Sequence, residues 1–342
     1  MRAAIQPAVL TLASPLHAAY GTLRERTVLQ LRLEDDAGRT GWGEAAPLEP
    51  YDGISTARCA RALEAYLPIL ADPPQRTGAA IIDACRAADP LPQALAAVDL
   101  ALWDLAGRRE GRPVAELLAD EPLSAVPVNA TIGAEDRAGA AAQAALAAER
   151  GFRCVKLKVG TGDDGGRVAA VRAAAGPAMA LRLDANGAWD VEGAVRAIEA
   201  LAPAGLELVE EPVHGIDALR QVRRRVATRI AMDETTAEPG AIASGAADAV
   251  CLKLTRAGGI AGLLAQAALV RATGAEAYLA STLDGPLGIA AALHCAAALR
   301  VELPCGLATL GLFAGIEAPG LEPRDGAIQL PSGPGLGVSP LR

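Results

Sequence analysis

Three carboxylates stand at the ends of three successive apolar runs in the second half of the sequence. The runs "ALRLD", "LELVE" and "RIAMD" end in Asp184, Glu210 and Asp233. If these runs are parallel strands of a barrel, their carboxyl ends meet at one mouth, where active sites lie. Converging carboxylates repel one another unless a cation lies between them, and hard oxygen ligands suit Mg²⁺ better than Zn²⁺. The alternative is that each acid caps the helix that follows it.

Lysine is rare in this chain and occurs where the same pattern places it beside the acids. Of the 32 Lys and Arg residues, only Lys156, Lys158 and Lys253 are lysine. Lys158 ends the run before the first acid and Lys253 ends the run after the last, which predicts amines on opposite sides of the mouth. Arginine is not deprotonated in proteins, whereas a lysine amine can take a proton. Lys156 points to the same side as Lys158, one layer deeper, where we expect it to pair with a carboxylate.

These residue types predict proton abstraction from the carbon next to a carboxylate. Such a proton is weakly acidic, and Mg²⁺ on the substrate carboxylate stabilises the enediolate that forms. We therefore expect Lys158 to be the base and Lys253 to lie on the other side of the substrate. The expected cofactor is Mg²⁺, with Mn²⁺ as a substitute, and the expected partner is a small carboxylate substrate.

The segments that would position these residues alternate between short apolar runs and Ala-rich helical runs. The strand candidates are 126–132, 154–159, 180–185, 206–212, 229–234, 249–254 and 276–281, with an eighth at 301–307. Helical runs lie between them, among them 137–151, 239–248 and 288–300. Seven or eight βα units predict an α/β fold with a parallel barrel. A doubly wound open sheet is the alternative, although no GxGxxG motif follows a strand.

The first part of the chain has a different organisation. Two β-rich runs surround the turn "DDAGR" within 27–47, and helical stretches follow at 54–71 and 90–111. These patterns indicate an α+β block. The predicted division is an α+β domain at 1–120, a barrel at 121–307, and a Gly/Pro-rich tail at 308–342 that packs back on the first domain.

Composition argues against several classes of protein. The net charge of -8 gives no basic footprint for a nucleic acid, and no run of about 18 apolar residues suggests a membrane span. Six cysteines without a CxxC pair, at 59, 85, 154, 251, 295 and 305, predict reduced, buried thiols in a cytoplasmic protein. A zinc site or a disulfide framework is the alternative. The composition is compatible with a homo-oligomer.

With these motifs in this order, the chain resembles the enolase superfamily, in its muconate lactonizing enzyme subgroup. The matching motifs are "KLK" at 156–158, "DANGAW" at 184–189, "EEP" at 210–212, "DE" at 233–234, "LKLTRAGG" at 252–259, and the N-terminal "GWGEAAPLEPYDG" and "AVDLALWDLAG". The resemblance implies an N-terminal α+β capping domain on a modified (β/α)7β TIM-type barrel, with Mg²⁺ on the three acids and two lysines at the reacting centre. It also implies supporting roles for Asn186 and Glu234.

Within that subgroup, "LASTLDGPLG" and "LPCGLATLGLF" resemble the o-succinylbenzoate synthases. These Mg²⁺-dependent lyases dehydrate 2-succinyl-6-hydroxy-2,4-cyclohexadiene-1-carboxylate in menaquinone biosynthesis. The resemblance implies that Lys158 is the base and later protonates the departing hydroxyl, while Lys253 stabilises the enediolate as a cation. The expected substrate-binding residues are Ser281, Thr282 and Asp284 in the turn, and His17 and Tyr51 in loops at 16–23 and 47–53 that would close over the substrate.

Other functions within and beyond the subgroup stay open. Dipeptide epimerases and N-acylamino acid racemases share both lysines, but the epimerases usually carry an Asp-x-Asp after the eighth strand, and 301–316 has none. Muconate-type cycloisomerases and the racemases usually have a Met-Glu-type turn where Thr282, Leu283 and Asp284 stand. A non-catalytic enolase-like protein should have lost a ligand or a lysine, and none is missing here.

Overall fold

A computed structural model describes residues 1–18, 21–73, 77–133 and 136–341, with the side chains of His17 and Ala18 outside the described set. The strands are β1 (Arg2–Ala18), β2 (Gly21–Glu34), β3 (Thr40–Ala45), β4 (Ala125–Pro127), β5 (Ala130–Ile132), β6 (Cys154–Lys158), β7 (Ala180–Asp184), β8 (Leu206–Glu210), β9 (Arg229–Met232), β10 (Ala249–Leu252), β11 (Glu276–Leu279) and β12 (Ala327–Gln329). The α-helices are α1 (Glu49–Asp52), α2 (Thr56–Ala71), α3 (Gly78–Ala88), α4 (Pro92–Glu110), α5 (Val114–Leu118), α6 (Arg137–Glu149), α7 (Asp164–Ala175), α8 (Val191–Leu201), α9 (Ile216–Arg223), α10 (Leu254–Ala257), α11 (Ile260–Ala272) and α12 (Pro286–Ala298). The 3₁₀ turns are η1 (Ala202–Ala204), η2 (Glu234–Ala237), η3 (Ala241–Ala243) and η4 (Leu310–Leu312).

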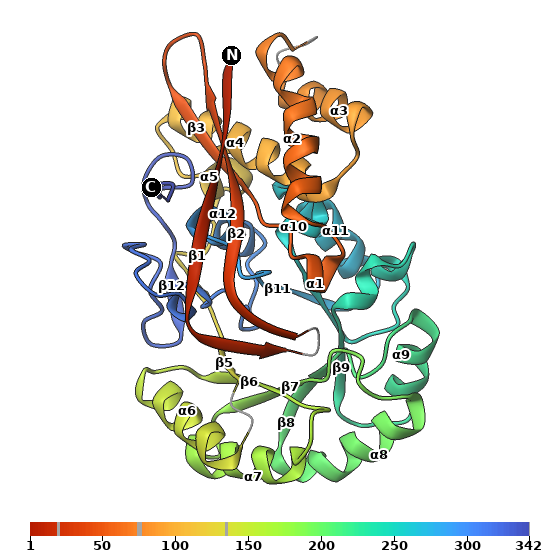
Figure 1. Cartoon of the computed structure of the whole chain (residues 1–342). Coiled ribbons are helices and arrows are strands. Elements are labelled where there is room, and N and C mark those ends of the chain that lie inside the picture. Colours follow the sequence, from red (N-terminus) through yellow and green to blue (C-terminus); the bar gives the residue numbers. More distant parts are fainter. Residues whose placement is uncertain (19–20, 74–76, 134–135, 342) are drawn as a thin grey trace.

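The N-terminal part is an antiparallel sheet, β1-β2-β3, with helices α2 to α4 packed against it (Figure 1). The two β-rich runs around "DDAGR" are β2 and β3, as the sequence predicts, whereas the long strand β1 was not anticipated. In β3, Gly41 and Gly43 lie directly against α4, and a Cβ at Gly43 would lie 1.9 Å from the Ala97 carbonyl oxygen. Larger residues at these two positions would therefore push the helix off the sheet.

The second part is a parallel seven-stranded sheet in the order β11-β10-β9-β8-β7-β6-β5, with α6 to α9 on its outer side (Figure 1). The predicted barrel is confirmed. The expected eighth strand at 301–307 is wrong in extent, because only isolated bridges join Cys305 to Val128 and Gly306 to Ala280. These bridges connect the two edges of the sheet, and Pro304 cannot donate a backbone hydrogen bond to lengthen the pairing. The expected helix at 239–248 is only the turn η3, because Pro and two glycines interrupt that run.

The C-terminal tail returns to the first part of the chain. Ala314 N donates to Thr11 O at 2.8 Å, Val114 N donates to Gly335 O at 2.9 Å, and Phe313 bridges Leu12, whereas β12 pairs with β4 at the start of the barrel part. We propose that the chain divides near residue 120, between α5 and β4, and that the tail from residue 308 belongs with the first domain in packing. These backbone contacts between distant segments support the proposal.

Two segments of the first domain reach the barrel mouth. The ends of β1 and β2 form a hairpin rather than the loop expected at 16–23, with Leu16 paired to Leu23. Leu16 lies against Gly133 beyond β5, where an added Cβ would be 3.6 Å from Leu16 Cδ1. The second segment is α1, which follows Leu48 and carries Tyr51. The hairpin and α1 lie in the two segments, 16–23 and 47–53, that the sequence predicts to close over a substrate.

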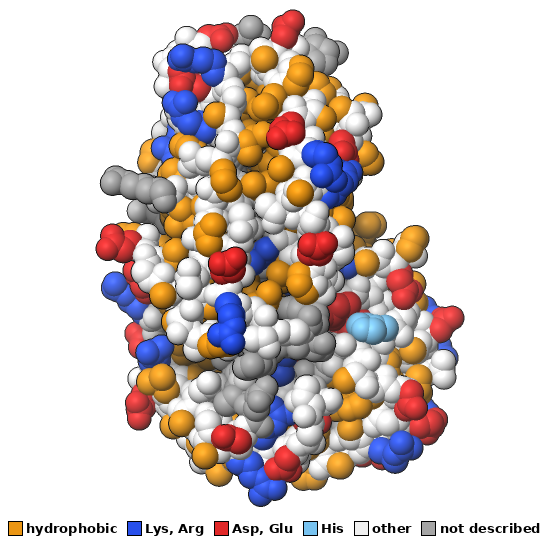
Figure 2. Space-filling model, in the orientation of Figure 1, with side chains coloured by type: hydrophobic (Ala, Val, Ile, Leu, Met, Phe, Trp, Pro, Cys, Tyr) orange, Lys and Arg blue, Asp and Glu red, His pale blue; other side chains and the backbone are white. Residues whose placement is uncertain are grey.

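The surface in Figure 2 mixes charges of both signs. Hydrophobic side chains gather over the first domain, between its sheet and α2, while Lys and Arg alternate with Asp and Glu around the barrel helices (Figure 2). None of the helices in the described ranges has the length and apolar character needed to cross a bilayer.

Removing the Asp104 carboxylate is expected to destabilise the protein strongly. The fully buried carboxylate accepts from Trp42 N at 2.8 Å, from Leu336 N at 2.7 Å and from Arg108 Nε at 2.9 Å. Asp104→Ala leaves two buried backbone donors unpaired, so we expect a loss of about 3 kcal/mol in the free energy of unfolding. Urea denaturation measures it. Asp83→Ala, which removes an exposed partner of Arg86, is the control and should change little; equal losses would contradict the assignment.

Candidate active site

The charged residues predicted at the strand ends lie side by side in the sheet register. Lys158 of β6 is paired with Asp184 of β7, and Asp184 with Glu210 of β8. Asp233 follows β9 directly, and Lys253 follows β10. The strands therefore bring three acids and two lysines to one end of the barrel, because neighbouring parallel strands end at the same edge.

The two lysines of β6 both contact the acids. Lys158 Nζ donates to Asp184 Oδ2 at 3.0 Å and to Asn186 Oδ1 at 2.6 Å. Lys156 Nζ lies deeper, 3.0 Å from Glu210 Oε1 and 3.1 Å from Asp184 Oδ2. One amine thus holds two carboxylates together, and the other faces the mouth.

Lys253 approaches from the opposite side of the acids. Its Nζ contacts both oxygens of Asp233 and donates to the Tyr51 hydroxyl at 2.7 Å. The ring of Tyr51 also lies below this amine, with Nζ 4.6 Å from the ring centroid, which is a cation–π distance. Tyr51, for which the sequence predicts substrate contact, lines the cavity at the mouth and also contacts Lys253 and Asp233.

Asn186 and Glu234 join the ends of β7 and β9. Asn186 Nδ2 donates to Glu234 Oε1 at 2.8 Å, while its amide oxygen accepts from Lys158. Asn186 has φ 45, in the left-handed region that asparagine tolerates better than most residues. This backbone turn aims the amide at both neighbours.

Three contacts to this group were not predicted from the sequence. Glu211 accepts from Asp233 N at 2.7 Å and fixes the turn after β9. Tyr278 OH donates to Glu210 Oε2 at 2.8 Å, and Arg256 donates to the Tyr51 hydroxyl at 3.0 Å. The alternation of side chains in β11 could have placed Tyr278 inside the barrel. The contacts of Glu211 and Arg256 depend on the turns that follow β8 and β10, and the sequence does not reveal the direction of these turns.

Burial and the lysines together set the charge states of the acids. Burial favours the neutral form of Asp184, but Lys156 and Lys158 outweigh it and hold its pKa below the usual range. Burial also disfavours the ammonium of Lys253, yet Asp233 raises its pKa well above the usual value. For Glu234, burial and the nearby Asp233 raise the pKa to about 8. Asp184 is therefore held as a carboxylate and Lys253 as an ammonium ion, while Glu234 keeps its proton up to about pH 8.

The donor set fits a divalent cation. Ligand atoms of Glu210, Asp233 and Cys251 lie within 4.8 Å of one another, and all three residues are buried. Asp184 is linked to this cluster through Lys156, which contacts both Asp184 and Glu210. Carboxylate oxygens from three adjacent strands are the ligands that Mg²⁺ prefers. Asp184, Glu210 and Asp233 are the residues that would hold such an ion.

A small cavity of about 100 Å³ lies at the mouth and is lined by both Lys158 and Lys253. Its lining is Leu16, Leu48, Tyr51, Thr131, Lys156, Lys158, Asp184, Asn186, Asp233, Lys253, Ala280, Ser281, Thr282, Leu283, Gly306, Thr309 and Leu312. Ser281 and Thr282 therefore lie where substrate contact was predicted. The Asp284 side chain is buried, accepts from Thr282 Oγ1 at 2.7 Å and does not belong to the described cavity lining, so its contact with substrate stays a prediction. The predicted contact of the His17 side chain lies outside the described residues.

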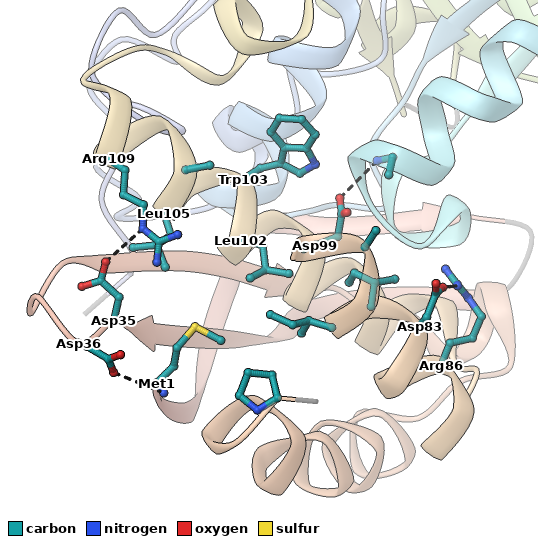
Figure 3. A pocket seen from close by; sticks show the side chains of 17 residues that line it. Met1, Asp35, Asp36, Asp83, Arg86, Asp99, Leu102, Trp103, Leu105 and Arg109 are labelled. Atoms are coloured by element: carbon teal, nitrogen blue, oxygen red, sulfur yellow. Dashed lines mark hydrogen bonds and ion pairs between the residues drawn. The ribbon is translucent and has the colours of Figure 1, made fainter. Parts of the chain in front are cut away.

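A larger cavity lies elsewhere in the described structure, so size does not identify the site. It measures about 710 Å³ and lies in the first domain between the β2–β3 turn, α3 and α4. Figure 3 shows Arg109 pointing to Asp35 and Arg86 to Asp83, with Leu102, Leu105 and Trp103 around an apolar hollow. Its lining contains no lysine and none of the strand-end acids. The chemistry therefore places the site at the barrel mouth.

A buried carboxyl pair joins the first domain to the turn that lines the mouth. Glu44 of β3 accepts from Gly285 N, at the start of α12, at 2.7 Å. Burial and the neighbouring Asp284 raise the pKa of Glu44 to about 8, with Arg26 opposing the shift. Glu44 therefore keeps its proton up to about pH 8.

This raised pKa predicts a pH-dependent stability. Folded Glu44 keeps a proton that the unfolded chain releases near its ordinary pKa of 4.5. Stability from this group is therefore complete below that value and is lost as the pH rises to about 8. Glu44→Gln keeps the acceptor without a charge, so we expect it to gain on the order of 2 kcal/mol over the wild type near pH 8, and little near pH 5. Urea denaturation at both values checks this, and parallel pH profiles would contradict it.

The fold and site define a class of protein, a barrel enzyme with strand-end carboxylates and lysines at its mouth and a domain that covers it. The family description "Enolase C-terminal domain-like" matches residues 139–342, and "Mandelate racemase / muconate lactonizing enzyme, N-terminal domain" matches residues 1–119. The chain belongs to the enolase superfamily, as its motifs predicted.

Relatives within the superfamily carry different activities. The chain is 32% identical to the L-Ala-D/L-Glu epimerase of Bacillus subtilis, over 96% of this chain and 93% of that protein. It is 41% identical to the o-succinylbenzoate synthase of Thermobifida fusca, over only 55% of this chain and 61% of that protein. The solved dipeptide epimerase of Enterococcus faecalis, complexed with Mg and L-Leu-L-Tyr, superposes with a TM-score of 0.93 at 28% identity and covers 99% of both chains. The protein is therefore an enzyme of this superfamily, of lyase or epimerase type.

Proposed function

We propose that this protein is a Mg²⁺-dependent lyase that removes a proton next to a substrate carboxylate and eliminates water, as o-succinylbenzoate synthases do. The observation that carries the proposal is that Lys158 and Lys253 line one cavity together with Asp184 and Asp233. A substrate carboxylate held at the acids by a divalent cation would present its α carbon to both amines.

Each residue then has a defined task. After its own proton has left to solvent, Lys158 Nζ takes the α proton, and the electrons of the broken C–H bond move toward the carboxylate. The resulting ammonium returns the proton to the hydroxyl as the C–O bond breaks, so that water leaves. Bound Mg²⁺ would supply positive charge to the carboxylate oxygens as negative charge develops on them. Lys253 stays protonated, held by Asp233 and Tyr51, and faces the substrate as a fixed cation. Asn186 orients Lys158 through their 2.6 Å contact.

The lining of the cavity favours dehydration of a substrate without an ammonium group. Asp184 and Asp233 are the carboxylates among the described lining residues, and both are engaged by lysines and assigned to the metal. Apart from the three lysines, Asn186 and Tyr51, the remaining lining consists of apolar residues, Gly306 and the hydroxyls of Thr131, Ser281, Thr282 and Thr309. These hydroxyls can bind a second carboxylate or a carbonyl, as on a succinyl group. The partial similarity to an o-succinylbenzoate synthase supports the same reading.

Epimerisation of dipeptides or racemisation of N-acylamino acids is the second candidate. Its support is the full-length similarity to an L-Ala-D/L-Glu epimerase and the placement of an amine on each side of the acids. Two amines on opposite faces could remove and return a proton from different sides. A muconate-type cycloisomerase is the third candidate, and its support is the full-length similarity to a muconate cycloisomerase.

An assay with Mg²⁺ and the cyclohexadiene carboxylate tests the first candidate. We expect loss of the diene ultraviolet absorbance with kcat/KM of about 10⁴ M⁻¹s⁻¹ or more. If there is no turnover, incubation with dipeptides and N-acylamino acids in D₂O, followed by mass spectrometry, tests the second, since α-deuterium uptake marks epimerisation. No reaction in either assay would contradict both candidates.

Lys253→Arg is expected to separate the two activities. The substitution keeps a cation beside Asp233 but removes the amine that could exchange a proton. We expect dehydration to remain measurable, while deuterium uptake from the second face of a racemising substrate falls by about 10². Initial rates with the two substrate classes check this. Equal losses in both reactions would show that the amine acts through charge alone.

The proposed location is a reducing compartment such as the cytoplasm. All six cysteines are free and buried, which suits a protein that never meets an oxidising environment.

A further inference from the structure

We propose that Cys251 is a ligand, together with Glu210 and Asp233, for a thiophilic divalent cation such as Zn²⁺ or Cd²⁺. The ion would occupy the position proposed above for Mg²⁺ and exclude it, so the proposal rests on the metal role of the two carboxylates. None of the motifs that identify the family includes this thiol. If Cys251 is a ligand, the site binds Zn²⁺ or Cd²⁺ more tightly than the Mg²⁺ proposed to act in catalysis.

The position of the thiol follows from strand β10. Cys251 lies two residues before Lys253, so both side chains point into the barrel. The thiol and one oxygen from each of Glu210 and Asp233 lie within 4.8 Å of one another. Of the cysteines in the described residues, Cys251 is the one that forms such a cluster with acids.

Cys251 belongs to the lining of a second cavity next to the group of acids and lysines. This cavity measures about 480 Å³ and is also lined by Lys253, Glu234 and Arg256. Tyr51 and Lys253 line both this cavity and the smaller one at the mouth. The two cavities therefore border the same group of charged residues.

Ion size and softness favour the assignment. With bonds of about 2.3 Å to sulfur and about 2.1 Å to oxygen, two ligands of a tetrahedral zinc ion are roughly 3.6 Å apart. The cluster would contract by up to about 1 Å, which rotation of the side chains can provide. Thiolate sulfur binds zinc-like ions well and Mg²⁺ poorly, so the thiol discriminates between them.

Ultraviolet titration of the whole protein with Cd²⁺ tests the inference, with equilibrium dialysis to count the bound ion. We expect a sulfur-to-metal charge-transfer band that saturates at one ion per chain and is reversed by excess Mg²⁺. Cys251→Ala should lose the band and bind Cd²⁺ about tenfold or more weakly. Cys85→Ala, which removes a buried thiol in α3 of the first domain, is the matched control and should keep both.

The alternatives give distinct results. Cd²⁺ that binds in competition with Mg²⁺ but shows no band in the wild type would overturn the thiol ligand and leave the carboxylate site intact. A band that persists in Cys251→Ala would assign it to another cysteine, which also overturns the inference. If neither Mg²⁺ nor Cd²⁺ binds, the metal role of Glu210 and Asp233 fails together with the inference.

Discussion

Lys158→Ala is expected to lower the rate of α-proton removal by about 10³ or more, with either class of substrate. The substitution removes the amine that faces the mouth and lies 3.0 Å from Asp184 Oδ2. Because the return of the proton to the departing hydroxyl uses the same nitrogen, dehydration and deuterium exchange should fall together. Single-turnover measurements of ring absorbance and of deuterium uptake give the two rates separately.

A matched variant distinguishes loss of the base from loss of charge. Lys158→Arg keeps a cation that can contact Asp184 and Asn186 but cannot be deprotonated. We expect it to be as inactive as Lys158→Ala, while binding a carboxylate substrate more nearly like the wild type. Near-normal turnover of either variant would move the base to another residue, with Lys253 the first to examine.

Glu210→Gln is expected to weaken Mg²⁺ binding strongly and to lower kcat/KM on the order of 10³. Glu210 is fully buried and contacts both Lys156 and Tyr278, so the amide would fit the space but would lose the charge that holds a cation. Isothermal titration with Mg²⁺ measures binding directly. Glu199→Gln, on the exposed face of α8, makes the same chemical change without effect. Unchanged Mg²⁺ affinity in Glu210→Gln would remove this residue from the metal site.

The acids and lysines at the mouth could be found from the sequence because the physics that places them is local. A strand ends at a defined residue, its side chains alternate, and parallel neighbours end at the same edge. Asp184, Lys158 and Lys253 follow from these rules alone. The barrel itself follows from the alternation of apolar and Ala-rich runs.

Contacts between distant segments could not be found in that way. The sequence places Asp284 in a turn, but it does not show that Glu44, which comes from the first domain, lies beside it in a buried pair. Tyr51 contacts Lys253 across about two hundred positions of sequence. Strand β1 was missed because its pairing partner defines it more than its own pattern does. The length of the eighth strand was overestimated. The run at 301–307 is largely hydrophobic, but Pro304 and Gly306 limit its pairing with neighbouring strands.

The return of the tail to Asp104 bears on the order in which the protein matures. A ribosome makes the helix that carries Asp104 long before it makes Leu336, whose backbone amide completes the hydrogen bonding of that carboxylate. Until then, a buried acid in the nascent first domain lacks one of its partners, and β4 lacks β12. Domains usually fold in the order of their synthesis. Here the first domain reaches its final packing only after the barrel has emerged, so a stalled or truncated chain would present an incomplete cap to chaperones and proteases.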